Sequence, residues 1–238
     1  MTCDIDQVRE AFPGRRIHYY DTLASTMLAA AELDTNSVVV AGHQTAGQGR
    51  HGHVWHSEAG KGLYVSVVLP PAPVLTLALG LATVEAIAEV CGLACDLRWP
   101  NDLMIGGRKV AGILVQLIDG RAIAGIGINV NHTAFPPELA HEATSLRLAS
   151  GAGVECTGLL IGLLRAIDSF VREDKETILR LFTRGSSYAA GRRVTVALPG
   201  GDIEGTTAGL DADGFLIVRK DDGTEALILA GGVRAAGS

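Results

Sequence analysis

Residues 42–64, with the sequence GHQTAGQGRHGHVWHSEAGKGLY, lie between two apolar runs and contain six glycines. The runs, 37–41 and 63–69, predict two strands joined by a glycine-rich loop. Because Gly has no Cβ, the backbone of such a loop can approach a ligand closely. Arg50, near the middle of the loop, offers five donors suited to phosphate or carboxylate. The stretch therefore predicts an anion site held by two strands; the alternative is a flexible strand connection.

The loop matches neither of the common nucleotide-binding loops. Residues 47–52, GQGRHG, fit the dinucleotide pattern G-x-G-x-x-G, but a Rossmann fold needs a helix to begin at the third glycine. Here HVWHS at 53–57 leads toward the next strand, and no Gly-Lys-Ser/Thr follows. We expect His51, His53 and His56 to be solvated loop residues, on the view that no Cys or carboxylate nearby completes a tetrahedral metal set.

The composition is that of a folded, acidic protein. Hydrophobic residues make up 47% and charged residues 19%, which argues against disorder. The 238 residues suffice for one large domain or for a medium domain with a small one. The net charge of −6 argues against a non-specific DNA- or membrane-binding surface.

The sequence predicts a cytoplasmic protein. Residues 1–10 contain neither an apolar signal core nor a basic segment. The longest apolar run, 74–90, is interrupted by polar residues, so it predicts a buried helix and not a membrane span. The four cysteines lack zinc-pair spacing and are interpreted as reduced structural thiols: Cys3, Cys91, Cys95 and Cys156.

Hydrophobic periodicity predicts a first domain of strands and helices. The expected helices are 5–12, 26–33, 74–90 and 158–184, the last open to a break. The expected strands are 16–20, 37–41, 63–69, 97–99, 103–105, 110–118 and 122–130. Asp119-Gly120 is a strong two-residue hairpin signal between the last two strands. Because these strands are nearly all apolar, we expect a sheet covered on both faces.

The pattern changes near residue 187. Short strands at 193–198, 202–210, 215–219 and 225–229 are separated by Gly/Asp turns, including Gly200-Gly201, which is typical of a small β-barrel. We therefore predict an α+β protein with a first domain at 1–187 and a second at 188–238.

Two polar segments have both a structural and a functional interpretation. Ser25 and Thr26 precede an Ala-rich run, so they cap a helix or present hydroxyls and free N–H groups to a ligand. In the sequence RWPND at 98–102, Asn101 and Asp102 are turn residues or hold a hydrated Mg²⁺ against substrate phosphates.

Two strands carry residues that are unusual in a strand. Lys109, one of only four lysines, opens an apolar strand, where it either reaches water at an edge or pairs with an anion. Gly112 within that strand indicates close approach by a ligand or by backbone. In GIGINV at 125–130 the glycines allow either close strand packing or a flat ligand, which Asn129 would hydrogen-bond.

Taken in order, these segments resemble the biotin protein ligase (biotin–[acetyl-CoA-carboxylase] ligase) family in its monofunctional form. Each segment alone is unspecific, but the combination covers most of the chain. The resemblance implies a mixed β-sheet catalytic domain with helices, followed by an SH3-like β-barrel. It also implies two substrates, ATP and biotin, with Mg²⁺. Biotinyl-5′-AMP would form first, and biotin would then pass to a lysine of the biotin carboxyl carrier protein of acetyl-CoA carboxylase.

The resemblance also implies roles for individual residues. The catalytic residues would be Lys109 and Arg50, and Asp102 would bind the metal. Biotin would be bound by Ser25, Thr26, Met27, Gln44, Gln48, Gly49, Arg50, Lys109, Gly112 and Gly125. ATP would be bound by Arg50, Trp55, Asn101, Lys109 and Asn129.

Four positions depart from the family pattern. Met27 stands where the family usually has Asn, and it cannot supply amide hydrogen bonds. Gln48, His51 and His53 lie in a loop that is usually richer in arginine. We predict that activity is retained through Arg50 and Lys109, with looser retention of the adenylate.

Two other functions stay open at this point. A lipoate–protein ligase or octanoyltransferase shares the catalytic fold, and a catalytically silent biotin or nucleotide binder would share the site. Only 24 residues precede Ser25, too few for the helix-turn-helix domain of bifunctional members, so no operator binding is expected. The sequence leaves open whether the chain is a homodimer or a monomer, and which carrier protein it serves.

Overall fold

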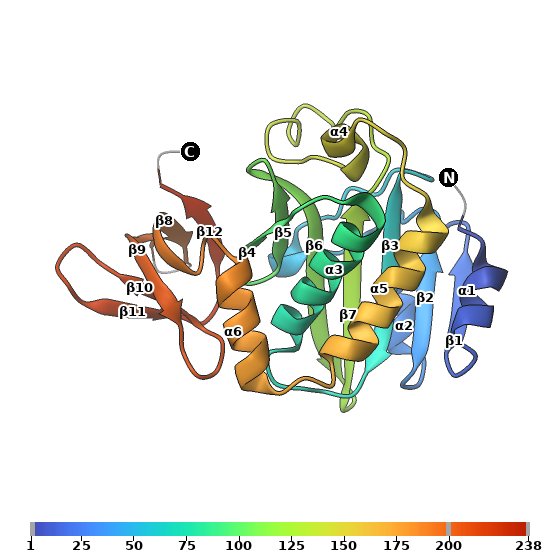
Figure 1. The fold of residues 1–238 in the computed structure, drawn as a ribbon, viewed down its shortest axis with the longest axis horizontal. Helices are drawn as coiled ribbons and strands as arrows, with labels where there is room; N and C mark the ends of the chain where they lie inside the picture. Colours follow the sequence, from blue (N-terminus) through green and yellow to red (C-terminus); the bar gives the residue numbers. More distant parts are fainter. Residues whose placement is uncertain (1–2, 199–200, 237–238) are drawn as a thin grey trace.

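The computed structural model describes residues 3–198 and 201–236 and contains two sheets (Figure 1). The larger sheet has the strand order β1-β2-β3-β7-β6-β5-β4. Its strands are β1 (Arg16–Tyr20), β2 (Ser37–Ala41), β3 (Gly62–Leu69), β4 (Asp96–Arg98), β5 (Asp102–Ile105), β6 (Arg108–Ile118) and β7 (Arg121–Asn129). Only β1 and β2 pair in parallel, so the sheet is mixed, as predicted.

The hairpin between β6 and β7 lies in the middle of the sheet. Asp119 and Gly120 have φ values of 48° and 73°, and a two-residue turn of this kind requires positive φ at both positions. The turn fixes the register, which places Gly112 opposite Gly127 and Leu114 opposite Gly125. The sequence therefore predicted this hairpin correctly, including its turn.

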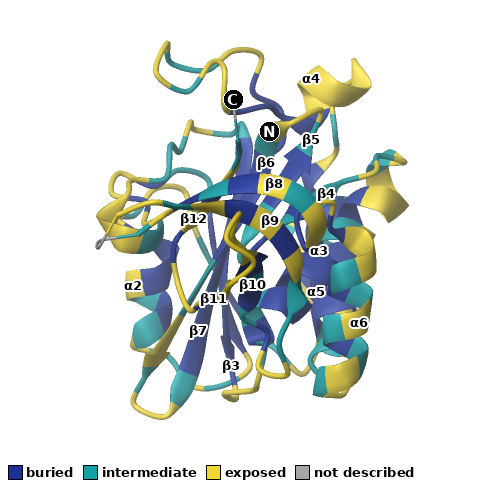
Figure 2. Ribbon diagram, turned by 90° about the vertical axis from the view of Figure 1, so that its left-hand side faces the viewer, coloured by how far each residue is buried: buried dark blue, intermediate teal, exposed yellow. Residues whose placement is uncertain are grey.

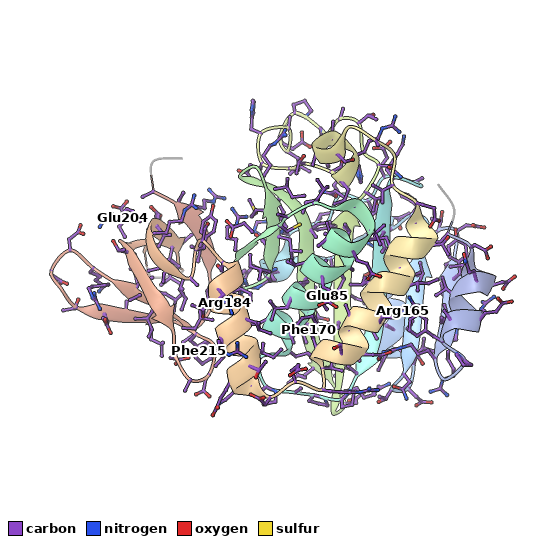
Figure 3. All side chains as sticks on the ribbon, in the orientation of Figure 1. Glu85, Arg165, Phe170, Arg184, Glu204 and Phe215 are labelled. Atoms are coloured by element: carbon purple, nitrogen blue, oxygen red, sulfur yellow. A yellow bond between two sulfur atoms is a disulfide. The ribbon has the colours of Figure 1, made fainter. Side chains whose placement is uncertain are left out.

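Helices form a layer on one face of the sheet (Figure 1). This layer contains α1 (Ile5–Ala11), α3 (Leu75–Cys91), α5 (Cys156–Phe170) and α6 (Lys175–Gly185). Helix α3 is apolar around most of its circumference because it lies between the sheet and α5. The side chains in Figure 3 fill the space between these layers, and the main core of buried apolar residues lies there.

The opposite face of the sheet is only partly covered, which corrects the expectation of cover on both faces. Helix α2 (Thr26–Ala31) contacts β2, β3 and β7 there, around a small core that includes Met27, Val39 and Ile123. Figure 2 shows the buried strands beside the exposed surface of α2. The part of this face that α2 leaves uncovered carries the candidate site described below.

The second sheet follows α6 and is antiparallel throughout, with the order β11-β10-β9-β8-β12. Its strands are β8 (Ala190–Ala197), β9 (Ile203–Leu210), β10 (Leu216–Arg219), β11 (Glu225–Ile228) and β12 (Gly232–Ala235). Trp99 Nε1 donates to the carbonyl of Gly214 at 2.9 Å and ties this sheet to the larger one. The arrangement agrees with the predicted SH3-like barrel. The predicted Gly200-Gly201 turn lies partly outside the described residues.

Several elements differ from the sequence prediction. The short elements β12, η1 (Arg50–Gly52) and α4 (Leu146–Ser150) were missed, whereas the long helix is broken into α5 and α6, a break that the prediction allowed. Cys3 and Cys156 form a disulfide, with their Cα atoms 5.1 Å apart, so the reduced-thiol interpretation was wrong for this pair. Cys91 and Cys95 are free, as expected. Among the described residues, no helix is long and apolar enough to cross a membrane.

Candidate functional site

Three glycines form the floor of a pocket on the open face of the sheet. Gly112 of β6 and Gly127 of β7 are direct neighbours in register, and Gly125 lies two residues along β7 on the same face. A Cβ on any of them would lie within 3 Å of another side chain, because Trp55 or Met27 rests directly on the backbone there. Large side chains at these positions would fill the pocket, so glycine keeps the floor open.

Lys109 reaches this floor because β6 is irregular. Pairing with β5 shifts between Leu103 and Met104, which leaves Val110 as an extra residue in β6. Without the bulge, the alternation of a strand would place Lys109 and Gly112 on opposite faces. With it, the Lys109 Nζ lies 3.1 Å from where a Cβ on Gly112 would be. The ammonium therefore lies over the pocket floor.

An acidic partner holds Lys109 in place. Asp102 Oδ1 lies 2.5 Å from Lys109 Nζ, and Asp102 Oδ2 lies 2.6 Å from an Arg98 guanidinium nitrogen. Burial alone would raise the pKa of the Asp102 carboxyl, but the charges of Lys109 and Arg98 and their hydrogen bonds outweigh burial and lower it. The carboxylate thus stays ionised and positions two cations at the end of β5.

Asp102 does not fit a metal ligand in this arrangement. Mg²⁺ is held through one or two carboxylate oxygens, and here each oxygen of Asp102 is already paired with a cation. The Asn101 amide oxygen, the atom that could bind a metal, is engaged as well, since it accepts from an Arg50 guanidinium nitrogen at 3.1 Å.

The glycine loop forms another part of the pocket lining, through Gln48, Gly49, Arg50 and Trp55. Gly49 N donates to His53 O and Trp55 N donates to Gly47 O, so the loop is a small hairpin. Arg50 lies at its tip in η1 and donates to Asn101 Oδ1 at 3.1 Å and to the carbonyl of Gly231 at 3.4 Å. Burial lowers the pKa of Arg50, and the charge of Asp102 partly offsets this effect. The loop therefore brings a second cation to the pocket.

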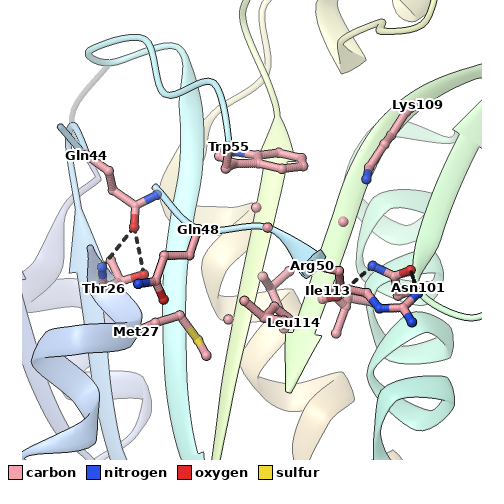
Figure 4. A pocket seen from close by; sticks show the side chains of 15 residues that line it. Thr26, Met27, Gln44, Gln48, Arg50, Trp55, Asn101, Lys109, Ile113 and Leu114 are labelled. Carbon is pink, nitrogen blue, oxygen red and sulfur yellow. Dashed lines mark hydrogen bonds between the residues drawn. The ribbon is translucent and has the colours of Figure 1, made fainter. Parts of the chain in front are cut away.

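Two side chains, Trp55 and Met27, lie on the floor. The Trp55 indole lies over Gly112 and Gly127, and its Nε1 has no partner among the described residues (Figure 4). Lys109 Nζ lies 5.5 Å from the centroid of the ring, a cation–π contact. Met27 places its sulfur over Gly125. A ligand that uses the floor must therefore displace the indole.

A polar group lies at the α2 end of the pocket. Gln44 Oε1 accepts from Thr26 N at 2.8 Å and from Thr26 Oγ1 at 3.1 Å, and Ser66 Oγ donates to Thr26 Oγ1 at 2.8 Å. Ser25 stands at the helix N-terminus, but its side chain caps no N–H group. Its buried hydroxyl has no partner in the described part of the chain. The capping interpretation of Ser25 is thus wrong, and an unpaired hydroxyl points to a missing polar ligand.

Most of the predicted site residues come together in the structure. Those that line the pocket are Thr26, Met27, Gln44, Gln48, Gly49, Arg50, Trp55, Asn101, Lys109, Gly112 and Gly125. Asp102 does not line the pocket but forms an ion pair with Lys109. Asn129 also lies outside the lining, and its amide donates to the carbonyl of Thr144 at 3.1 Å. The lining also includes Ile113, Leu114, Ile126 and Gly127, which the predicted site lacked. The period-two spacing of Gly125 and Gly127 was the signal for the last of these.

A second polar cluster lies beside the pocket. His51 and His53 are exposed, as expected, but His56 is half-buried and lies near Glu58 and His132. The expectation that no carboxylate accompanies these histidines was wrong, because Glu58 follows His56 by two residues. His132 is fully buried, and burial first, then the charges of His56 and Lys61, lower its pKa to about 4.

Two family models match this chain and define its class. The biotin/lipoate A/B protein ligase family matches residues 14–132, and the biotin protein ligase C-terminal domain matches residues 190–233. The first match contains the glycine loop, the floor glycines and Lys109. The second match falls on the five-stranded sheet.

Individual relatives narrow the class. The bifunctional ligase/repressor BirA of Bacillus subtilis is 34% identical over 238 residues, covering 91% of this chain and 73% of the relative. The biotin–[acetyl-CoA-carboxylase] ligase of Mycobacterium tuberculosis is 33% identical over 218 residues, covering 86% and 80%. The solved biotin protein ligase of Aquifex aeolicus, in complex with biotin and ATP, superposes with a TM-score of 0.84 at 30% identity, covering 93% and 99%. The chain belongs to the biotin protein ligase family.

Proposed function

We propose that this chain is an ATP-dependent biotin–[acetyl-CoA-carboxylase] ligase. The observation that carries this proposal is the placement of two cations, Lys109 and Arg50, over a floor of glycines. A flat, uncharged ring fits the floor, and the anions of a carboxylate and a phosphate fit the cations. Biotin carries a flat ring and a carboxylate, and ATP supplies the phosphate.

In the first half-reaction, a biotin carboxylate oxygen attacks the α-phosphorus of ATP. The bond from the α-phosphorus to the bridging oxygen breaks, pyrophosphate leaves with the electron pair, and biotinyl-5′-AMP forms. Lys109, fixed by Asp102 at 2.5 Å, is the cation between the carboxylate and the α-phosphate. A fixed charge stabilises the developing transition state without reorganising. Arg50 holds the phosphate from the loop side.

In the second half-reaction, the neutral amine of a carrier-protein lysine attacks the acyl carbon of biotinyl-5′-AMP. An amide forms, AMP leaves with the electron pair of the acyl–oxygen bond, and the amine loses its proton. The proposed partner is the biotin carboxyl carrier protein of acetyl-CoA carboxylase, which places the reaction in the cytoplasm. The amine must reach the site from outside, so the loop that carries Arg50 has to leave the acyl carbon accessible.

The biotin ring is proposed to lie toward α2. The hydroxyls of Ser25 and Thr26 and the amide of Gln44 supply polar partners there, and Met27, Gln48, Gly49, Gly112 and Gly125 complete the contact surface. Trp55 leaves the floor and covers the adenine, while Asn101 and Asn129 complete the nucleotide site. The unpaired Nε1 of Trp55 supports this movement, since a buried donor is stabilised by a new partner.

Mg²⁺ is proposed to enter with ATP as the counter-ion of its phosphates. Asp102 is the predicted metal ligand, but it would have to give up an ion pair to bind the metal. The steps proposed here therefore use protein groups alone.

The chain is further proposed to divide at residue 187 into a catalytic domain, 1–187, and a small domain, 188–238. The second sheet begins at Ala190, which supports this division. The carbonyl of Gly231 in the small domain accepts from Arg50, so the small domain helps to hold the loop over the pocket.

Transfer of biotin to an isolated acetyl-CoA carboxylase carrier domain, with Mg-ATP, tests the proposed function. We expect transfer of biotin and none of lipoate. Transfer of lipoate instead would assign the chain to the lipoate branch of the family. Binding of biotin and ATP without pyrophosphate release would identify a silent binder.

A further inference from the structure

We propose that His56, Glu58 and His132 form a site for a divalent cation of the zinc class. The three residues offer two imidazole nitrogens and one carboxylate oxygen, which lie within 4.8 Å of one another. The cluster lies outside the ligand pocket, since none of its members is among the lining residues.

Backbone pairing brings the three residues together. Strands β3 and β7 are antiparallel neighbours, and Gly62 pairs with Asn129 at the end of their register. Beyond this pair, the carbonyl of Lys61 accepts from Val130 N at 3.1 Å and from Asn131 N at 2.6 Å. The residue after Asn131 is therefore held against the segment that precedes β3, which carries His56 and Glu58.

His132 is the observation that points to a ligand. The side chain is fully buried, and neither ring nitrogen has a hydrogen-bond partner among the described residues. Its backbone is fixed, because Ser145 Oγ donates to the His132 carbonyl at 2.7 Å. Its ring is stacked on Phe135, with centroids 5.0 Å apart and an interplanar angle of 17°. A rigid, buried imidazole without partners is destabilising unless a bound group satisfies it.

The chemistry of the cluster favours zinc over magnesium. Zn²⁺ prefers imidazole nitrogen with carboxylate oxygen at about 2.0–2.2 Å, whereas Mg²⁺ prefers six oxygens. In a tetrahedral site with such bonds, ligand atoms lie about 3.3–3.6 Å apart. The three atoms here need shifts of roughly an ångström, which rotation of the exposed Glu58 and the half-buried His56 side chains can supply.

The charged neighbours of the cluster and the exposure of Glu58 also bear on cation binding. Lys61 and His56 both act electrostatically on His132, and the Glu58 carboxylate supplies the negative charge within the cluster. Exposed Glu58 leaves one side of the site open, so an ion can enter and a fourth position remains for water.

Zinc titration of the full chain, freed of metal with a chelator, tests the site. We expect one Zn²⁺ per chain in competition with a chromophoric chelator, unaffected by a large excess of Mg²⁺. His56→Gln and Glu58→Gln each remove a ligand at the surface, so both should fold and weaken Zn²⁺ binding at least roughly 10-fold. His53→Gln, three residues from His56 and exposed, is the matched control and should bind as the wild type does.

A second readout is independent of ligase activity. Zn²⁺ should raise the Tm of the wild type and of His53→Gln, because it binds only the folded chain. At the same Zn²⁺ concentration it should raise the Tm of His56→Gln less, because this variant binds the ion more weakly. The proposal is overturned if the wild type binds no stoichiometric Zn²⁺, or if both ligand variants bind it as tightly as the wild type.

Discussion

The ligand pocket has two walls that are built differently. The strand wall is the β6–β7 hairpin, which carries the glycine floor and Lys109, and the loop wall is the glycine loop, residues 42–61. The β6–β7 wall is paired along its length, mostly buried, and holds Lys109 through the Asp102 and Arg98 ion pairs. The glycine loop is held by a few backbone hydrogen bonds, and residues 51–54 at its tip are exposed. A segment with many backbone hydrogen bonds resists local unfolding, whereas a segment with few opens at a low cost in free energy. We infer that the strand wall supplies a charge in a fixed position, whereas the loop supplies groups that move.

Replacement of Lys109 should have the largest effect. Lys109→Ala removes the fixed cation of the strand wall, and loss of one preorganised group of this kind costs about 100- to 1,000-fold in rate. ATP- and biotin-dependent pyrophosphate release measures it. Arg50→Ala should reduce that rate less and accelerate release of biotinyl-AMP instead, because Arg50 belongs to the loop.

Lys220→Ala is the control for this comparison, since Lys220 is exposed on the small domain. Equal losses of rate in Lys109→Ala and Arg50→Ala would remove the distinction between the walls.

A methyl group on the floor should have the next largest effect. In Gly127→Ala the new Cβ would lie 2.5 Å from the Trp55 ring and would occupy the space proposed for the ligand. Overpacking costs about 1–3 kcal/mol, or roughly 5- to 150-fold in the Kd for biotin. Isothermal titration calorimetry measures the Kd. Gly14→Ala, where a Cβ meets nothing within 4 Å, should bind biotin normally; normal binding by Gly127→Ala would mean that the ligand does not use this floor.

The ion pairs of the strand wall should make stability depend on pH. The pKa of Asp102 lies below its ordinary value of 3.8 in the folded protein. The ionised carboxylate therefore stabilises the fold above pH 3.8, and this contribution is lost as the pH falls through the folded-state pKa. Asp102→Asn should lower the free energy of unfolding at pH 7 by about 1–3 kcal/mol.

Urea unfolding at pH 7 and at pH 3 or below checks this prediction. The difference between wild type and Asp102→Asn should shrink as the carboxylate becomes protonated. A difference that is constant with pH would show that the ion pairs do not hold the wall. Asp202→Asn, at an exposed position just before β9, is the control and should change stability little.

The smallest effect is expected at the loop tip. His51→Arg adds a cation at an exposed position of the loop, so biotinyl-AMP should leave a few-fold more slowly in the absence of carrier. A chase experiment with labelled adenylate measures its release. Wild-type release as slow as that of an arginine-rich relative would show that this loop is not looser.

The strand wall was more predictable from sequence than the loop wall. Apolar runs and the Asp119-Gly120 turn determine β6, β7 and their register, because these signals are local. The position of Lys109 over Gly112 depends on the bulge at Val110, which arises from pairing with β5 and leaves no local signal. The sequence therefore singled out Lys109 and Gly112, which the structure brings together, but not why they meet.

The loop and its surroundings depend on contacts that are distant in sequence. Arg50 donates to Asn101 and Gly231, and Trp55 packs on Gly127. The sequence shows that the loop contains an arginine and a tryptophan, but these distant contacts determine where their side chains lie. The same reason explains the missed cluster, since His132 joins His56 only through the pairing of β3 with β7. The disulfide between Cys3 and Cys156 likewise spans most of the chain.

Amide hydrogen exchange with and without biotin plus ATP tests the contrast between the walls most directly. Our account predicts that the ligands slow exchange in residues 42–61 strongly, whereas β6 and β7 exchange slowly in both states. Lys109→Ala should lose most of the loop protection, because the adenylate that closes the loop no longer forms. Protection that is confined to β6 and β7, or an unchanged loop in the wild type, would contradict the account.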